Sequence, residues 1–133
     1  MTDLLFFYGT LMSGFQRAGR SRVDAKLAAI GRGSIAAALF DLGIYPAAIP
    51  SADSRVNGEV YRMSDGENVL AILDELEGHR PTEPDTSLYR RIETPVMMGD
   101  GEMAQAWVYF YNAPLGQAQR IESGDYLDHL KVK

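Results

Sequence analysis

The chain has 133 residues, of which 46% are hydrophobic and 23% charged, and its formal net charge is -5 at pH 7. This length and composition are typical of a globular protein with one core, so we expect residues 1–133 to form a single domain. Cysteine is absent, which excludes disulfides, thiolate nucleophiles and cysteine-based metal sites.

The residues 4–8 form a continuous apolar run closed by a glycine, which predicts a strand buried on both faces at the centre of a sheet. Residues 12–32 are less regular. There we expect a loop with one or two helical turns at 24–30, ended by Gly31 and Gly33.

The middle of the chain predicts two strands and a proline-containing connection. Residues 34–42 indicate one strand, and residues 55–63 alternate as a second, in which Gly58 marks a bulge or a close backbone approach. Between them, Pro46 and Pro50 exclude a central strand. We therefore expect an edge segment or an extended loop at this point.

The clearest helix covers residues 65–77. Ser64 and Glu67 have the spacing of a capping box at its start, and Gly78 occupies the position of a left-handed residue that ends a helix. Residues 78–87 contain two prolines and many polar groups. This composition predicts a surface loop, long enough for a lid or a rim.

Two further strands are predicted at residues 88–98 and 104–111, joined by a glycine-rich hairpin turn. The C-terminal segment predicts a short helix or an irregular wrap. Since the strands are joined mostly by turns, the chain predicts an α+β fold. Its small mixed β-sheet curls into a barrel, and one main helix packs on it.

Charge and hydropathy limit the partners. Nucleic-acid binding depends on clustered lysines and arginines, so the acidic balance argues against it. No apolar run approaches the roughly 20 residues of a membrane span, so we expect a cytoplasmic protein with no membrane partner. One basic group has no interleaved aromatic residues and is typical of an exposed loop: Arg17, Arg20, Arg22 and Lys26.

Several kinds of catalytic site are excluded by motif. His79 and His129 lack the spacing of a zinc-binding helix, and no G-x-S-x-G elbow places a serine nucleophile. A phosphate-binding loop and a dinucleotide-binding glycine motif are also absent. Carboxylates therefore remain as the candidates for proton transfer.

The predicted helix ranks these carboxylates. On a wheel of about 100° per residue, Glu77 lies about 70° from the centre of the apolar stripe, whereas Asp74 and Glu75 lie about 130° away. Burial and the carbonyl end of the helix would both raise the pKa of Glu77 toward neutrality. The alternative is an ion pair, which would lower that pKa, with one of the arginines Arg80, Arg90 and Arg91.

The turn after the first strand is the second candidate. Gly9 allows dihedral angles that other residues avoid and leaves the neighbouring amides unshielded, so the turn could present N–H groups to an anion. The hydroxyl of Thr10 would add a donor. The alternative is that Gly9 and Thr10 only reverse the chain.

Six stretches together resemble a known family. The stretches FFYGTLM, LGIYPAAIP, VNGEVYRM, LDELEG, LYRR and AWVYFY occur in the order and spacing of the γ-glutamylcyclotransferase-like family, also called AIG2-like. The resemblance covers about residues 4–126. Its most specific part is the pair formed by the Y-G-T-L turn and the L-D-x-x-E motif.

The resemblance implies a small barrel with a cavity at one end. In this family the turn holds the substrate and the glutamate of L-D-x-x-E is the acid and base, which implies that Glu77 is catalytic. The family's enzymes cyclise a γ-glutamyl group and release 5-oxoproline and an amine or amino acid. No cofactor or metal is implied, because the nucleophile is the substrate's own amine. The implied substrate-binding residues are Tyr8, Gly9, Thr10 and Leu11.

Other residues have weaker assignments. Tyr89 and Arg91 could line the rim or support the site, or they could be a sheet residue and a surface ion pair. Tyr109 and Tyr126 are more typical of core. The turn reads Y-G-T-L where another branch of the family has Y-G-S-N, which places the chain closer to the branch that acts on γ-glutamylamines.

Two alternatives to the enzyme stay open at this stage. One is a non-catalytic module that binds a small carboxylated metabolite in the same pocket. The other is an interaction domain whose partner docks on the 79–88 loop and the basic segment at 17–26.

Overall fold

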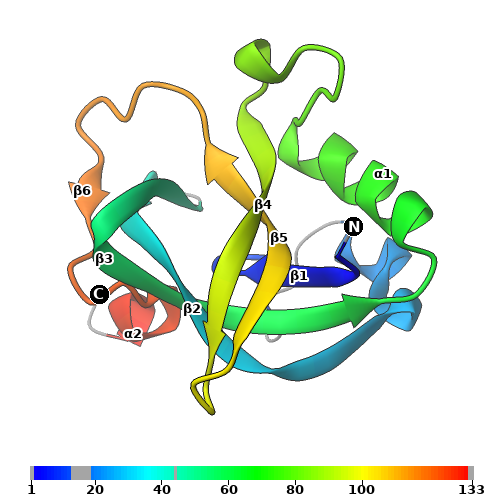
Figure 1. Cartoon of the computed structure of the whole chain (residues 1–133). Helices are drawn as coiled ribbons and strands as arrows, with labels where there is room; N and C mark the ends of the chain where they lie inside the picture. Colours follow the sequence, from blue (N-terminus) through cyan, green and yellow to red (C-terminus); the bar gives the residue numbers. More distant parts are fainter. Residues whose placement is uncertain (1, 13–18, 44, 132–133) are drawn as a thin grey trace.

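The computed structural model describes residues 2–12, 19–43 and 45–131. Six strands form one sheet in the order β3-β1-β5-β4-β2-β6, and a further pairing of β3 with β2 closes five of them into a barrel (Figure 1). The predicted α+β fold, with a mixed sheet curled into a barrel and one main helix, is confirmed. The strands are β1 (Leu4–Phe7), β2 (Leu27–Asp41), β3 (Pro46–Met63), β4 (Tyr89–Met98), β5 (Met103–Tyr111) and β6 (Gln119–Arg120). The helices are α1 (Gly66–Glu77) and α2 (Tyr126–Lys131), with 3-10 turns at Arg20–Arg22, Asp24–Lys26 and Pro84–Thr86.

Strand β1 lies between two other strands in the wall of the barrel. It runs antiparallel to β3 and parallel to β5, and all four of its residues are buried. The predicted central strand is confirmed. Because its last residue is Phe7, the chain leaves the sheet at Tyr8, and the Y-G-T-L turn begins at this point.

Strand β2 corrects the prediction for residues 24–30. Only Asp24–Lys26 forms a turn of 3-10 helix, and from Leu27 the chain is extended. The glycines that were expected to end a helix lie inside the strand. A Cβ on Gly33 would lie 2.7 Å from Cγ1 of Val96, so glycine here allows β2 to cross close to β4.

The proline-containing connection is part of strand β3. Pro46 is the first residue of the strand, and Pro50 pairs with Ala37 next to a register shift that lies between Ala36 and Ala37. Both are positions where a strand tolerates a proline, which cannot donate a ladder hydrogen bond. Residues 46–50 pair with β2, as the edge segment that the sequence predicted. Further along β3, the predicted close approach at Gly58 is confirmed, since a Cβ there would lie 2.2 Å from the carbonyl oxygen of Phe7.

Helix α1 ends as predicted but begins differently. Gly78 has φ 70°, and its N–H bonds to carbonyl groups of the last turn, as in a glycine-capped helix end. The predicted capping box is wrong, because Asp65 precedes the helix in a left-handed conformation with no side-chain cap. Ser64 instead bonds the carbonyl of Lys26 through its N–H at 2.9 Å. The predicted apolar stripe packs on the barrel core through Val69, Leu70 and Leu73.

The remaining elements are the β4–β5 hairpin, the loop at 79–88 and the C-terminal segment. The hairpin of β4 and β5 forms with the predicted glycine-rich turn at 99–101. The loop at 79–88 is mostly exposed, and the C-terminal segment ends in the short helix α2. Over the described residues, no helix combines the length and apolar character that crossing a membrane requires.

Candidate active site

A cavity opens where β1 ends, facing the C-terminal end of α1. It encloses about 360 Å³ of space, including its open mouth. Six of the seven residues that the sequence singled out for the site line it, and Arg91 does not. The lining residues are Phe6, Phe7, Tyr8, Gly9, Thr10, Leu11, Tyr45, Pro46, Glu77, Tyr89 and Tyr109.

The turn that follows β1 forms one wall. The N–H of Met12 donates to the carbonyl of Gly9 at 3.0 Å, which closes a turn over residues 9–12. Gly9 does not have a positive φ, the dihedral range that glycine adopts more readily than other residues. Glycine is required at this position for steric reasons, because a Cβ would lie 2.7 Å from Cγ of Pro46. The absent side chain therefore lets the turn lie directly against β3.

Glu77, the last residue of α1, forms the opposite part of the lining. It is 9% exposed, so the prediction that this acid leans toward the core is confirmed. Two of the arginines proposed as alternative partners pair elsewhere. Arg91 binds Asp74, and Arg80 binds Glu83.

Tyr8 and Tyr89 line the same cavity as Glu77, and their phenol groups are neutral. Burial, and to a smaller extent the negative charge of Glu77, raises the pKa of Tyr8 well above its usual range. The pKa of Tyr89 is also raised, mainly by burial and further by its neighbours Tyr8 and Glu77. Both phenols therefore stay protonated at neutral pH and act as hydrogen-bond donors beside the carboxyl group.

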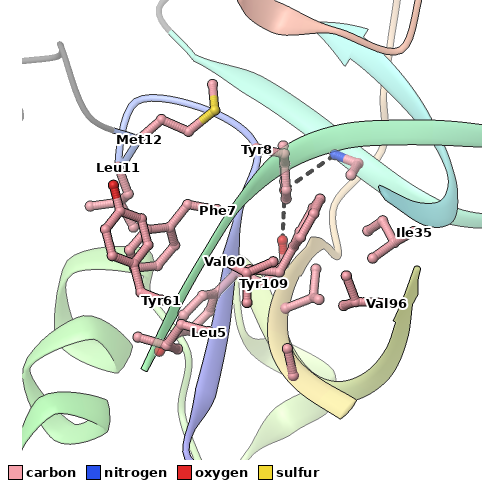
Figure 2. Packing of buried hydrophobic residues seen from close by; sticks show 14 of the residues in the cluster. Leu5, Phe7, Tyr8, Leu11, Met12, Ile35, Val60, Tyr61, Val96 and Tyr109 are labelled. Atoms are coloured by element: carbon pink, nitrogen blue, oxygen red, sulfur yellow. Dashed lines mark hydrogen bonds between the residues drawn. The ribbon is translucent and has the colours of Figure 1, made fainter. Parts of the chain in front are cut away.

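The hydroxyl groups of these tyrosines are anchored to the backbone. Tyr8 donates from its hydroxyl to the carbonyl of Tyr109 at 2.6 Å and accepts from the N–H of Ala48 at 3.3 Å, the two dashed bonds of Figure 2. Tyr89 donates to the carbonyl of Pro46 at 3.0 Å. Figure 2 also shows Phe7 and Tyr8 pointing to opposite sides of the chain. The rings are thus held as rigid walls of the cavity.

Behind one of these walls lies an ion pair that the sequence did not predict. Asp74 is 6% exposed, although its helical azimuth placed it far from the apolar stripe. Nε of Arg91 lies 2.8 Å from Oδ1 of Asp74, and Nη2 lies 3.2 Å from Oδ2. Tyr109 donates from its hydroxyl to the same Oδ1 at 2.7 Å. Arg91 is therefore connected to the cavity lining through Asp74 and Tyr109.

A further contact holds this ion pair in place. The guanidinium of Arg91 lies 4.5 Å from the centre of the Trp107 ring, a cation–π contact. Burial, followed by the charge of Asp74, raises the pKa of Tyr109, which keeps its hydroxyl a donor. The signal in the sequence was the acid of the LDELEG motif together with the arginines of LYRR, which the fold brings to the same place. Within the described ranges, no three His, Asp or Glu side chains gather as a metal site would require.

Comparison with known proteins gives one consistent result. A family model described as Gamma-glutamyl cyclotransferase, AIG2-like matches residues 5–128. The gamma-glutamylcyclotransferase family protein ytfP of Citrobacter rodentium is 34% identical over 125 residues, which are 93% of this chain and 95% of that protein.

Solved structures agree with this result. The solution structure of ytfP from Escherichia coli is similar with a TM-score of 0.66 at 31% identity, and the match covers 95% of this chain and 97% of that one. An aig2-like protein from Mus musculus has a TM-score of 0.69 at 23% identity, over 90% of this chain and 86% of that one. The second likeness shows a shared fold alone.

Proposed function

Because the chain belongs to the gamma-glutamyl cyclotransferase, AIG2-like family, we propose that it is an enzyme that cyclises a γ-glutamylamine and releases 5-oxoproline and a free amine. The observation that supports this most is that Glu77 lies on the same cavity as the turn at residues 9–11. An acid that can move protons and a turn that can hold an anion are the two parts that this reaction needs.

The turn binds the substrate's α-carboxylate. Residues 9–11 lie on the cavity wall, and backbone amides together with a hydroxyl such as that of Thr10 are the donors that suit a carboxylate. With the carboxylate held there, the α-amine and the γ-carbonyl extend toward Glu77. The same donors could not serve a cationic group, which gives the cavity its preference for the glutamyl end.

Glu77 carries the proton transfers. It takes a proton from the α-ammonium, whose nitrogen then attacks the γ-carbonyl carbon and forms the ring C–N bond. As the bond from that carbon to the departing nitrogen breaks, Glu77 gives the proton to this nitrogen. The ring nitrogen, still carrying one proton too many, returns it through Glu77 or to water, and the released amine is protonated in turn. No other nucleophile is needed.

The tyrosines and Arg91 support this chemistry without taking part in it. Tyr8 and Tyr89 wall the cavity and exclude water, which strengthens the interactions of the carboxyl group of Glu77. Arg91 is proposed as a positioning residue, because it holds Asp74, which holds the Tyr109 ring. Of the two positions that the sequence suggested for Arg91, at the rim or in support of the site, we therefore propose the second.

Release of 5-oxoproline from a panel of γ-glutamyl compounds tests the proposal. We expect at least one γ-glutamylamine to be turned over, and Glu77→Gln to reduce kcat by about 100-fold or more, since it can no longer accept a proton. Glu75→Gln, on the exposed face of the same helix, is the matched control and should retain activity. The proposal fails if no compound yields 5-oxoproline or if Glu77→Gln is fully active. Binding of γ-glutamyl compounds without turnover would instead support the non-catalytic module.

A further inference from the structure

A second cavity adjoins the first at Glu77. It encloses about 270 Å³, including its open mouth, and it is lined by Tyr45, Leu76, Glu77, Leu88 and Tyr89. Three of these, Tyr45, Glu77 and Tyr89, also line the cavity at the end of β1. The two cavities therefore share Glu77, the proposed proton carrier, as a lining residue.

The two cavities differ in chemistry. The first contains the turn at 9–11 with its hydrogen-bond donors, and the second contains none of that turn. The second cavity is lined by two leucines and two tyrosine rings. Glu77 is the one charged residue among its described lining residues. Leu88 is 41% exposed, so this cavity opens to the surface.

Its apolar wall is held in place by the backbone. Leu88 donates its N–H to the carbonyl of Gly78 at 3.1 Å, which ties the start of β4 to the end of α1. The rings of Tyr45 and Tyr89 meet edge to face, with centroids 6.1 Å apart. Leucine and aromatic surface on a fixed frame is a preformed apolar site, with little ordering required on binding.

We propose that this second cavity binds the departing amine. It selects amines whose alkyl or aromatic substituent carries no charged group. The inference rests on the proposed cyclotransferase function. In that reaction Glu77 gives its proton to the departing nitrogen, so the rest of that amine must extend away from Glu77 on the side opposite the glutamyl group. The second cavity is the space that lies there.

The charge of the lining sets the selectivity. An amino acid as the departing group would bring its carboxylate toward Glu77, with no cation among the described lining residues to offset the repulsion. Lysine that departs through its ε-nitrogen would place its charged α-ammonium and α-carboxylate against Leu76 and Leu88. An alkyl or benzyl group instead buries apolar surface against the leucines and the tyrosine rings.

The test is a set of γ-glutamyl derivatives of methylamine, butylamine, benzylamine, glycine and the lysine ε-amine, with kcat and KM measured from 5-oxoproline release. From methyl to butyl we expect kcat/KM to rise about fourfold for each methylene buried, the factor that corresponds to about 0.8 kcal/mol. The glycine and lysine derivatives should lie at least about tenfold below the butyl derivative.

Leu88→Arg provides the second arm of the test. It should lower kcat/KM for the butyl derivative and raise it for the glycine derivative, so that their ratio changes by about tenfold or more. The control Ile92→Arg changes a similarly exposed residue of β4 outside both cavities and should leave the ratio unchanged. This inference is overturned if all derivatives yield 5-oxoproline with no dependence on chain length, or if the ratio is unchanged in Leu88→Arg. Either result would still support the proposed cyclotransferase function. No product from any derivative overturns both.

Discussion

The hydroxyl of Tyr109 donates a hydrogen bond to Oδ1 of Asp74 at 2.7 Å, and this bond joins the cavity wall to an ion pair behind it. Asp74 also receives both the Nε and Nη2 groups of Arg91. Three side chains from α1, β4 and β5 are thus connected through one carboxylate. Because these three elements frame the cavity, the ion pair links the stability of the fold to the shape of the site.

Replacing Asp74 by asparagine should be strongly destabilising. The side chain of Arg91 is only 16% exposed, and Asp74→Asn leaves its charge without a counter-ion. Breaking a buried pair in this way costs about 3–5 kcal/mol of unfolding free energy. Urea unfolding followed by the fluorescence of the single tryptophan, Trp107, would measure it. Glu75→Asn, one residue along on the exposed face, is the control and should cost less than about 1 kcal/mol. A loss of that smaller size in Asp74→Asn would contradict the structure.

Replacing Arg91 by lysine tests the geometry of the pair apart from its charge. Lysine keeps the charge but cannot make the two-pronged contact with Asp74 or stack its head group flat over Trp107. We expect Arg91→Lys to lower the unfolding free energy by about 1–2 kcal/mol. Thermal unfolding would show it as a lower Tm, with Arg62→Lys, half of an exposed pair, as the unaffected comparison. An unchanged Tm in both variants would mean that charge alone matters.

Adding one methyl group at Gly9 should disturb the site. In Gly9→Ala the new Cβ would overlap the buried ring of Pro46, so the turn must move away from β3. Overpacking of this kind costs about 1–3 kcal/mol, and it displaces the amides proposed to hold the substrate. The same change at Gly66, the first residue of α1, meets nothing closer than 3.6 Å and should be neutral or stabilising. Calorimetric Tm values and binding of 5-oxoproline would separate the two variants, and equal behaviour would contradict the close approach.

Local sequence patterns were sufficient to predict much of the fold. The apolar run at 4–8 predicted β1, and Gly78 predicted the end of α1, because a buried strand and a left-handed helix end each depend on a few adjacent residues. The position of Glu77 followed from the period of the same helix. The two halves of the candidate site were therefore visible in the sequence, and the fold adds that they line one cavity.

What the sequence could not predict depends on residues that meet only in the folded chain. Asp74 is buried because Arg91 arrives from β4 and Tyr109 from β5, and a helical wheel contains neither. Gly33 was interpreted as a helix breaker, although the space it leaves is filled by Val96 of β4. The capping box at Ser64 failed because the carbonyl of Lys26 engages that residue instead. In each of these cases the local prediction failed because a contact between residues far apart in the sequence determines the structure.

Alkaline pH should unfold the protein through the buried tyrosines. The pKa values of Tyr8, Tyr89 and Tyr109 are all raised in the folded state, in each case mainly by burial, whereas in the unfolded chain they return to about 10. Above pH 10 the unfolded state therefore binds fewer protons than the folded state, and the unfolding free energy falls as pH rises. The stability from these groups is complete below pH 10 and is lost above it, by about 1.4 kcal/mol per pH unit for each tyrosine.

Urea unfolding at pH 9 to 11.5, with tyrosinate absorbance recorded in parallel, would check this. The three buried phenols should ionise only as the protein unfolds. Tyr8→Phe removes one of them, so its stability should fall less steeply with pH above 10 than that of the parent chain. At neutral pH the same variant should be less stable by about 1–3 kcal/mol, because the buried N–H of Ala48 loses the oxygen that accepts its bond. Equal slopes in the two proteins would show that Tyr8 ionises within the folded cavity, and the rigid wall assigned to it beside Glu77 would then be wrong.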